Sequence, residues 1–289
     1  MGKIIAVANQ KGGVGKTTTA VNLAASLGAM KKQVLLIDLD PQGSATVGSG
    51  LDKRQLEYSI NRVLLNEISI AQAIMPTPWH YHIIPSNGDL TVAEVRLLKT
   101  EGRENVLKEM LRPLAADFDF ILMDCPPSLN MLTVNALVAA DSVLVPIQCE
   151  YYAMEGLTSL LNSIDKIRRA VNPGLQLEGL LRTMYDGRNR LTIEVSEQLM
   201  RHFSDKIYHT VIPRNVRLAE APSFGIPALM HDKNSQGAVA YLALAAEMVR
   251  KQEIDYRCDP ATGSRDPEEV LNSPGSPAFA GDDNRRSGG

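Results

Sequence analysis

Two lysines bracket a glycine-rich run near the start of the chain, in the stretch ANQKGGVGKTTTAVNL at residues 8–23. Glycines in such a run let backbone N–H groups turn toward an anion, because no Cβ atom obstructs the turn. A helix that begins near Lys16 would point the positive end of its dipole at the same anion. Lys16 stands where a phosphate-binding loop needs a cation, so Lys11, five residues earlier, requires its own explanation.

The residues after the glycines fit the remaining contacts of a nucleoside triphosphate. Lys16 should neutralise the β- and γ-phosphates, the Thr17 hydroxyl should coordinate Mg²⁺, and Thr18 should reach the α-phosphate. The plainer alternative is a glycine-rich turn between a strand and a helix, and the complete Gly-Lys-Thr ending argues against it. The loop residues predicted to bind nucleotide are Lys11, Gly12, Gly13, Val14, Gly15, Lys16, Thr17 and Thr18.

Acidic residues end two further apolar runs. In VLLIDLDPQG, Asp38 and Asp40 flank one residue at a strand end, so they point the same way along an extended chain. In FDFILMDCPPS, Asp124 follows four apolar residues, as expected of a carboxylate that holds Mg²⁺ through a bound water. A helix cap or loop carboxylate is the alternative for Asp38, and a strand-terminal turn residue is the alternative for Asp124. With no Ser/His/Asp arrangement in view, the predicted chemistry is phosphoryl transfer to water.

The form K-G-G-V-G-K-T-T resembles the deviant Walker A motif of the ParA/MinD ATPases. In that family the first lysine reaches across a dimer interface to the partner's nucleotide, which implies that Lys11 acts on the other subunit's ATP as an arginine finger does. An exposed lysine before a turn is the alternative. The resemblance also implies that Asp40, before Pro-Gln-Gly, positions the attacking water, with Asp38 deeper behind the metal. The expected catalytic residues are Lys11, Lys16 and Asp40.

Two later segments, TMYDGRNRL and TVIPRNVRLAEAPSFG, resemble the ParA/Soj branch of this family. In that branch the proline and asparagine of IPRN border the adenine, which implies that Pro213 and Asn215 do so here, with Met184 nearby. A proline-led helix start is an alternative that does not exclude this role. The resemblance further implies non-specific DNA binding by Arg188 and Arg217. The residues that could extend this basic patch are Arg190, Arg214, Lys206 and Arg201.

The elements that must position these residues alternate along the chain. Apolar runs of strand length occupy residues 3–8, 33–39, 81–85, 118–124, 142–148 and 177–185. Helical patterns occupy residues 16–30, 132–140, 154–171 and 235–254. This alternation predicts an α/β fold with a mostly parallel, twisted sheet covered by helices on both faces. The resemblance implies that this fold is a P-loop NTPase of the deviant Walker A subclass. Ligands then bind at the carboxyl ends of the strands.

One domain and a tail are expected. Residues 1–258 read as the P-loop ATPase domain, whereas residues 259–289 are rich in Pro, Gly, Ser and Asp and predict a disordered tail. Three cysteines without paired spacing argue against a disulfide framework and suit a reducing cytosol. Cys125 and Cys149 lie in apolar runs and should be buried thiols. Tyr151 and Tyr152 could be either core or interface residues.

The overall charge of the chain does not indicate a nucleic-acid partner. The 289 residues carry a net charge of −3, although residues 182–217 hold seven Lys/Arg against four Asp/Glu. No signal peptide and no apolar run of membrane-spanning length is visible, so a cytoplasmic location is expected.

The resemblance covers about residues 3–250 and implies a ParA/Soj-type partition ATPase. Its implied cofactors are ATP and Mg²⁺, and its implied partners are a second copy of the chain, non-specific double-stranded DNA on the nucleoid and a ParB-type protein, without a membrane. A MinD-like membrane-associated ATPase is the first alternative, but an acidic-polar tail follows the last helix instead of a basic amphipathic one. A metallocluster reductase would need two cysteines near a dimer axis. The third alternative is a nucleotide-gated scaffold with negligible turnover, and the presence of Asp40 argues weakly against it.

Overall fold

The computed structural model describes residues 2–258, and their side chains as far as residue 254. Contacts divide the chain into two units, Met1–Glu247 and Met248–Gly289. The first unit carries the sheet and every predicted site residue. In the second, the described residues form the end of one helix, and the predicted disordered tail, residues 259–289, lies outside the described residues.

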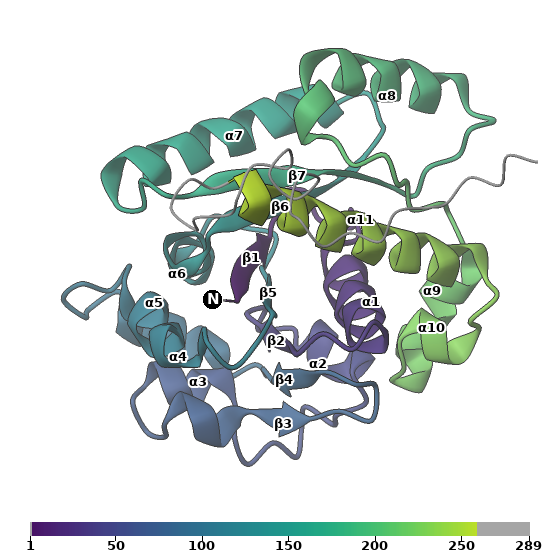
Figure 1. The fold of residues 1–289 in the computed structure, drawn as a ribbon. Helices are drawn as coiled ribbons and strands as arrows, with labels where there is room; N and C mark the ends of the chain where they lie inside the picture. Colours follow the sequence, from purple (N-terminus) through teal and green to yellow (C-terminus); the bar gives the residue numbers. More distant parts are fainter. Residues whose placement is uncertain (1, 259–289) are drawn as a thin grey trace, which may run out of the picture. The chain divides into compact units, whose positions relative to one another are not determined.

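Within the described residues, seven strands form a single sheet in the order β3-β4-β2-β5-β1-β6-β7 (Figure 1). Every pairing is parallel except β3 with β4. The strands are β1 (Lys3–Val7), β2 (Val34–Asp38), β3 (Met75–Pro76), β4 (His82–Ile84), β5 (Phe120–Asp124), β6 (Ser142–Gln148) and β7 (Gln176–Thr183). Six of them coincide with the six predicted runs. The sequence missed β3, because two residues that include a proline at a sheet edge show no periodicity.

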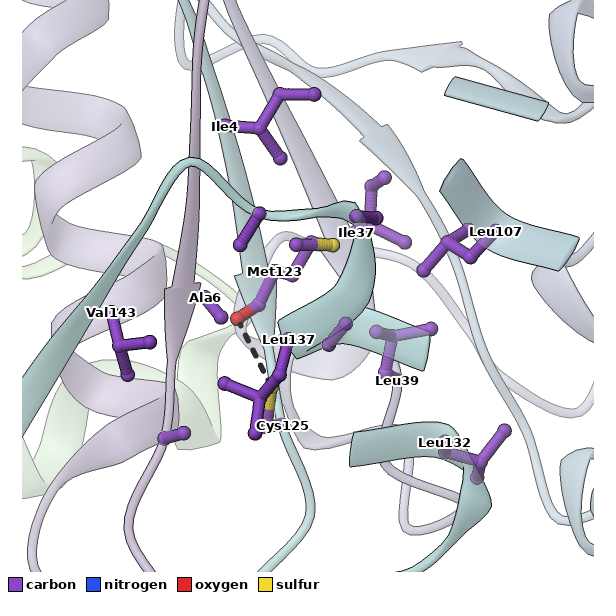
Figure 2. Packing of buried hydrophobic residues seen from close by; sticks show 14 of the residues in the cluster. Ile4, Ala6, Ile37, Leu39, Leu107, Met123, Cys125, Leu132, Leu137 and Val143 are labelled. Carbon is purple, nitrogen blue, oxygen red and sulfur yellow. Dashed lines mark hydrogen bonds between the residues drawn. The ribbon is translucent and has the colours of Figure 1, made fainter. Parts of the chain in front are cut away.

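Both faces of the sheet are buried. Alternate residues of neighbouring strands, such as Ile4, Ile37 and Met123, join one hydrophobic cluster, which Figure 2 shows from close by. The residues between them, such as Ile5 and Leu36, face the other way and are also fully buried. Parallel strands buried on both faces read as continuous apolar runs, which is why the sequence predicted them.

Helices cover the two faces. Helix α1 packs on β1, β2, β5 and β6, while α6 and α7 pack against β1 and β6 from the side of the cluster. The helices are α1 (Lys16–Ala29), α2 (Ser44–Gly48), α3 (Ile60–Leu64), α4 (Leu90–Leu97), α5 (Val106–Leu111), α6 (Met131–Ala139), α7 (Ala153–Ala170), α8 (Arg190–His202), α9 (Val216–Glu220), α10 (Ala228–His231) and α11 (Gln236–Cys258). The predicted fold class is therefore confirmed. In the part of the chain that the structure describes, no helix combines the length and apolarity needed to cross a membrane.

Candidate functional site

The glycine-rich loop joins the carboxyl end of β1 to the first turn of α1. Gly13 and Gly15 adopt φ angles of 76° and 88°, the left-handed region that residues with a Cβ avoid. A Cβ on Gly12 or Gly13 would meet no atom within 4 Å, so the space beside these two glycines is open. The Thr183 hydroxyl donates to the Val14 carbonyl over 2.8 Å and ties the loop to the end of β7. The loop is thus anchored to β7 and open beside its glycines, which suits an anion-binding loop.

A second anchor of the loop was not predicted from the sequence. Asn9 is buried, and its amide donates to the Pro146 carbonyl on β6 over 2.8 Å. Its side-chain oxygen accepts the backbone N–H of Lys11 over 3.0 Å. A polar residue directly after a buried strand was the only available signal. Asn9 therefore sets where the loop leaves the sheet.

Lys16 and Asp124 form the charged floor of this loop. Lys16 is 7% exposed, and its Nζ donates to the Lys11 carbonyl over 3.1 Å. Burial lowers the pKa of Lys16, and the charge of Asp124 opposes that shift. Burial raises the pKa of Asp124 well above its ordinary value, and the charge of Asp38 raises it further. Both oxygens of the Asp124 carboxylate are buried without a hydrogen bond of good geometry, although the Thr17 hydroxyl is close enough to lower its pKa.

The buried carboxylate of Asp124 suits a site for a divalent cation. A buried charge without partners is costly, so an Asp in this state is completed by a ligand. Mg²⁺ that bridges phosphates needs only one or two protein oxygens, because phosphates and waters supply the others. Thr17 and Asp124 can provide these oxygens. The described residues contain no cluster of three or more His, Cys, Asp or Glu side chains that could hold a metal without such help.

Asp38 lies beside Asp124, because β2 and β5 pair in parallel with these two residues in register. It is fully buried, and one carboxylate oxygen accepts both the backbone N–H and the hydroxyl of Thr46, each over 2.8 Å. The other oxygen accepts the backbone N–H of Asp40 over 3.1 Å. Burial raises the pKa of Asp38 to about 6, against these hydrogen bonds. These contacts with the first turn of α2 are the ones expected if Asp38 is a helix cap. The role of Asp38 behind the metal stays a prediction.

Lys11 has a partner that the sequence did not reveal. Its ammonium group forms an ion pair with Glu150, which follows β6. Both side chains are nearly half exposed. Nothing in the sequence links two charges that lie so far apart along the chain. In this single copy, the lysine of the deviant motif is thus bound by a carboxylate of its own chain.

A pocket of about 200 Å³ adjoins the loop and collects the residues predicted for adenine. Its lining residues are Gly15, Thr18, Thr183, Met184, Ile212, Pro213, Arg214, Asn215, Leu218, Ala219 and Tyr241. Most of the exposed lining is apolar, and its polar members include Thr18, Thr183, Arg214 and Asn215, which suits a purine site. Met184 adopts a φ of 49°, a strained conformation for this residue type that recurs at binding sites. Sequence reasoning missed Tyr241, whose hydroxyl is 3.1 Å from that of Thr19.

The predicted DNA-binding arginines lie on two adjoining segments. A parallel bridge between Tyr185 and Pro213 joins these segments, and the N–H of Arg214 donates to the Tyr185 carbonyl over 3.2 Å. The ion pairs on them are Arg188 with Asp186, Arg190 with Glu194, and Arg217 with Glu220 and Asp232. Arg188 hydrogen bonds lower the pKa of Asp186 to about 2, and Arg214 contributes. Arg214 also lines the base pocket, so it lies between the two predicted sites.

Several open questions of residue placement are answered. Tyr151 and Tyr152 are 75% and 69% exposed and pack edge to face, so they are not core residues. Cys125 and Cys149 are buried, as predicted, and burial raises the pKa of both thiols, that of Cys149 to about 11. Buried, protonated thiols are poor cluster ligands, which weakens the metallocluster alternative. Arg182, counted in the basic segment, is buried and donates to the Ser196 hydroxyl over 2.8 Å.

Comparisons with known proteins agree with this geometry. A family model described as an AAA domain matches residues 2–177. The chain is 48% identical over 252 residues to the chromosome partitioning protein ParA of Myxococcus xanthus, covering 87% of this chain and 89% of that protein. It is 49% identical over 249 residues to the sporulation initiation inhibitor protein Soj of Bacillus subtilis, covering 86% and 98%.

A solved structure shows the same fold. The cobyrinic acid a,c-diamide synthase of Mycobacterium smegmatis, with bound ADP and magnesium, superposes with a TM-score of 0.77 at 38% identity. The match covers 88% of this chain and 96% of that one.

Proposed function

The chain belongs to the ParA/Soj family of chromosome-partitioning ATPases, and from this premise we propose that it hydrolyses ATP with Mg²⁺ and binds DNA only while ATP joins two copies. The observation that carries the proposal is the floor of the loop. Buried Lys16 and the carboxylate of Asp124, whose oxygens accept no hydrogen bond of good geometry, lie beside the glycine-rich turn. Such a site is completed by a phosphate chain and a divalent cation together.

The protein groups divide the work of hydrolysis. The loop N–H groups and Lys16 hold the phosphates, and Thr17 and Asp124 hold the metal. Bound Mg²⁺ would neutralise charge that develops on the transferred phosphoryl group. Asp40 orients the attacking water from the loop after β2. The base lies in the pocket of Met184, Pro213 and Asn215, where backbone carbonyls can accept from an adenine amino group.

Lys11 completes the site of a second copy. Its ion pair with Glu150 is solvated on both sides, and such pairs contribute at most about 1 kcal/mol. Lys11 can therefore leave Glu150 at little cost when a more concentrated negative charge arrives on a partner's nucleotide. A cation supplied in this way stabilises transferred charge and makes ATP part of the dimer interface.

The arginine-bearing segments supply the DNA contacts. The side chains of Arg188 and Arg190 are 91% and 92% exposed, and each pairs with a carboxylate at the surface. Weak pairs of this kind exchange readily for phosphates. The patch carries no element that reads bases, so binding should be independent of sequence. A dimer doubles the patch, which links DNA affinity to the nucleotide. Location on the nucleoid in the cytoplasm and stimulation by a ParB-type protein complete the proposal, by analogy with the family.

The test compares DNA affinity with a non-hydrolysable ATP analogue, with ADP and without nucleotide, at fixed salt. We expect tight binding with the analogue alone, and loss of that binding in Lys11→Ala and in Arg188→Glu. Lys108→Ala and Arg169→Glu are matched controls, because both remove an exposed cation outside the loop and the basic segment. DNA binding that ignores the nucleotide would refute the proposal. Co-sedimentation with anionic liposomes under ATP would favour the MinD-like alternative.

A further inference from the structure

Two glycines from separate segments meet backbone to backbone. Gly50 follows α2 with a φ of 88°, and Gly225 ends the 3₁₀ helix η4 (Ala221–Phe224) with a φ of 67°. A Cβ on Gly225 would lie 3.1 Å from the Cα of Gly50 and 3.3 Å from the Val47 carbonyl oxygen. A Cβ on Gly50 would lie 3.0 Å from the Gly225 carbonyl oxygen. Because the opposing atoms are backbone atoms, they cannot rotate away, and any side chain would push the two segments apart.

One side of this contact leads to the hydrolysis site. Helix α2 begins directly after the loop that carries Asp40, and the Gly43 N–H donates to the Asp40 carbonyl over 2.9 Å. Thr46, within α2, is bound twice by the carboxylate of Asp38. The position of α2 therefore fixes the course of the Asp40 loop.

The other side leads to the proposed DNA surface. Helix α9 runs without a break into η4, so Arg217 and Gly225 lie at opposite ends of one helical run. The Gly225 N–H donates to the Pro222 carbonyl over 3.1 Å and closes that run. A shift of the backbone of this helical run at Arg217 would therefore be transmitted to Gly225.

The surroundings of the contact leave room for such a displacement. A cavity of about 230 Å³ lies between α1, α2 and η4, and its lining includes Gly48 and Ile226, which are close to the two glycines along the chain. Thr17 and Thr18 of the phosphate site line one wall, Ser44 and Gly48 line another, and Pro222 lines the third. The two segments are thus joined at the glycines and loosely packed next to them.

We infer that Gly225 is a positioning residue for the Asp40 loop, and that the Gly50–Gly225 contact couples DNA at Arg217 to the nucleotide site. This rests on the proposed function, because it requires both DNA binding and hydrolysis at the assigned residues. Coupling between two ligands is reciprocal, so DNA should change nucleotide affinity by the factor with which nucleotide changes DNA affinity.

The chain carries its own reporter at this contact. Trp79 is the one tryptophan of the sequence, and its indole nitrogen would lie 3.7 Å from a Cβ on Gly50. That nitrogen is buried without a hydrogen-bond partner among the described residues. Its emission should therefore respond when the contact shifts, without any label.

The experiment measures DNA affinity of the full chain with an ATP analogue and with ADP, in the parent protein and in Gly225→Ala. We expect the ratio of the two affinities to fall by about threefold or more in Gly225→Ala, while the part of the ratio that comes from dimerisation is retained. Binding of the analogue itself should change less than about twofold, because the base pocket and loop are untouched. Gly102→Ala is the matched control, since Gly102 has a similar φ of 64° but open space around its Cβ position.

The outcomes separate the two proposals. A parent protein without nucleotide dependence overturns both the proposed function and this inference. A parent with that dependence and a Gly225→Ala variant that keeps it overturns the inference alone. Should Gly225→Ala fail to fold, the same affinity ratio is measured in Gly50→Ala, and the Trp79 emission of the parent protein provides the second test of the inference. An emission spectrum unchanged by saturating DNA in the ATP state overturns the inference, and a shift that Gly102→Ala retains supports it.

Discussion

At the residue scale, two lysines five positions apart have opposite environments. Lys16 is buried, and its charge is balanced by Asp124, so its place in the loop is fixed before any ligand arrives. Lys11 is solvated and ion-paired with Glu150, so it is free to change partners. This difference would allow one motif to hold a phosphate and still offer a cation to another copy, as the proposed function requires.

Glu150→Gln should strengthen dimerisation in the presence of an ATP analogue. Removing the carboxylate frees Lys11 from its competing pair. Because a dimer contains two such pairs of about 0.2–1 kcal/mol each, dimer affinity should rise about 2- to 30-fold. Sedimentation velocity over a range of protein concentrations measures this. Glu155→Gln removes an exposed carboxylate in the first turn of α7 and should have no effect. A weaker dimer in Glu150→Gln would show that the carboxylate is needed within the complex.

At the element scale, strand register brings the acidic groups together. Parallel pairing of β2 with β5 sets Asp38 beside Asp124, and β1, next to β5, delivers the glycine-rich loop to the same edge. A comparable group of polar side chains lies at the opposite ends of the strands. There Glu178, on β7, pairs with Lys3 over 2.8 Å and accepts from the Ser142 hydroxyl over 2.7 Å and the Tyr208 hydroxyl over 3.0 Å.

Glu178→Gln should lower the free energy of unfolding by about 2 kcal/mol at pH 7, the scale of hydrogen bonds to a charged group. Burial raises the pKa of Glu178, but Lys3 and the hydroxyls lower it by more, so the net shift is downward. A lowered folded-state pKa stabilises the fold above the unfolded-state pKa of about 4.3, and this stabilisation is lost as the pH falls through the folded-state value.

The difference between parent and variant should therefore shrink as the pH is lowered toward about 3, and urea unfolding at several pH values measures it. Glu197→Gln, which removes an exposed helical ion pair with Arg201, should stay within about 0.5 kcal/mol of the parent throughout. A Glu178→Gln deficit that is the same at every pH would mean that packing, and not charge, is responsible.

At the scale of the whole molecule, charge distribution matters more than net charge. The chain carries −3 overall, yet Arg188, Arg190 and Arg217 lie on segments joined by the Tyr185–Pro213 bridge. In a dimer this surface occurs twice. Affinity should then depend steeply on salt, because each neutralised phosphate releases counterions.

Arg188→Ala should reduce the slope of log DNA affinity against log salt by about 0.9 for each phosphate that the arginine no longer neutralises, and thus by about 1.8 in a dimer. Fluorescence anisotropy with a labelled duplex in ATP analogue, over a salt series, measures the slope. Arg169→Ala, which removes an arginine from a helical ion pair on α7, should leave the slope unchanged. A parallel loss of affinity at all salt concentrations would show that Arg188 acts through the fold and not by binding a phosphate.

The fold was predictable to the extent that local pattern encodes it. The six strands were visible as continuous apolar runs, and α1, α6, α7 and α11 as periodic ones, because burial on two faces leaves a strong compositional signal. Helices α2 to α5, α8 and α10 and strand β3 were not predicted. Apart from α8, which has 13 residues, these elements have eight residues or fewer and carry too little periodicity. The positions of the loop residues and of Asp38, Asp40 and Asp124 at strand ends followed from the same runs.

The sequence by itself determined which chemical groups exist and which strand each one ends, because backbone conformation and burial leave their marks on neighbouring residues. Only the tertiary structure decided that Glu150 binds Lys11, that Tyr241 lines the pocket proposed for the base, and that Gly50 touches Gly225. These contacts join segments far apart in the chain. Their geometry depends on strand order and helix packing, which are set by the whole core and leave no mark on any single stretch.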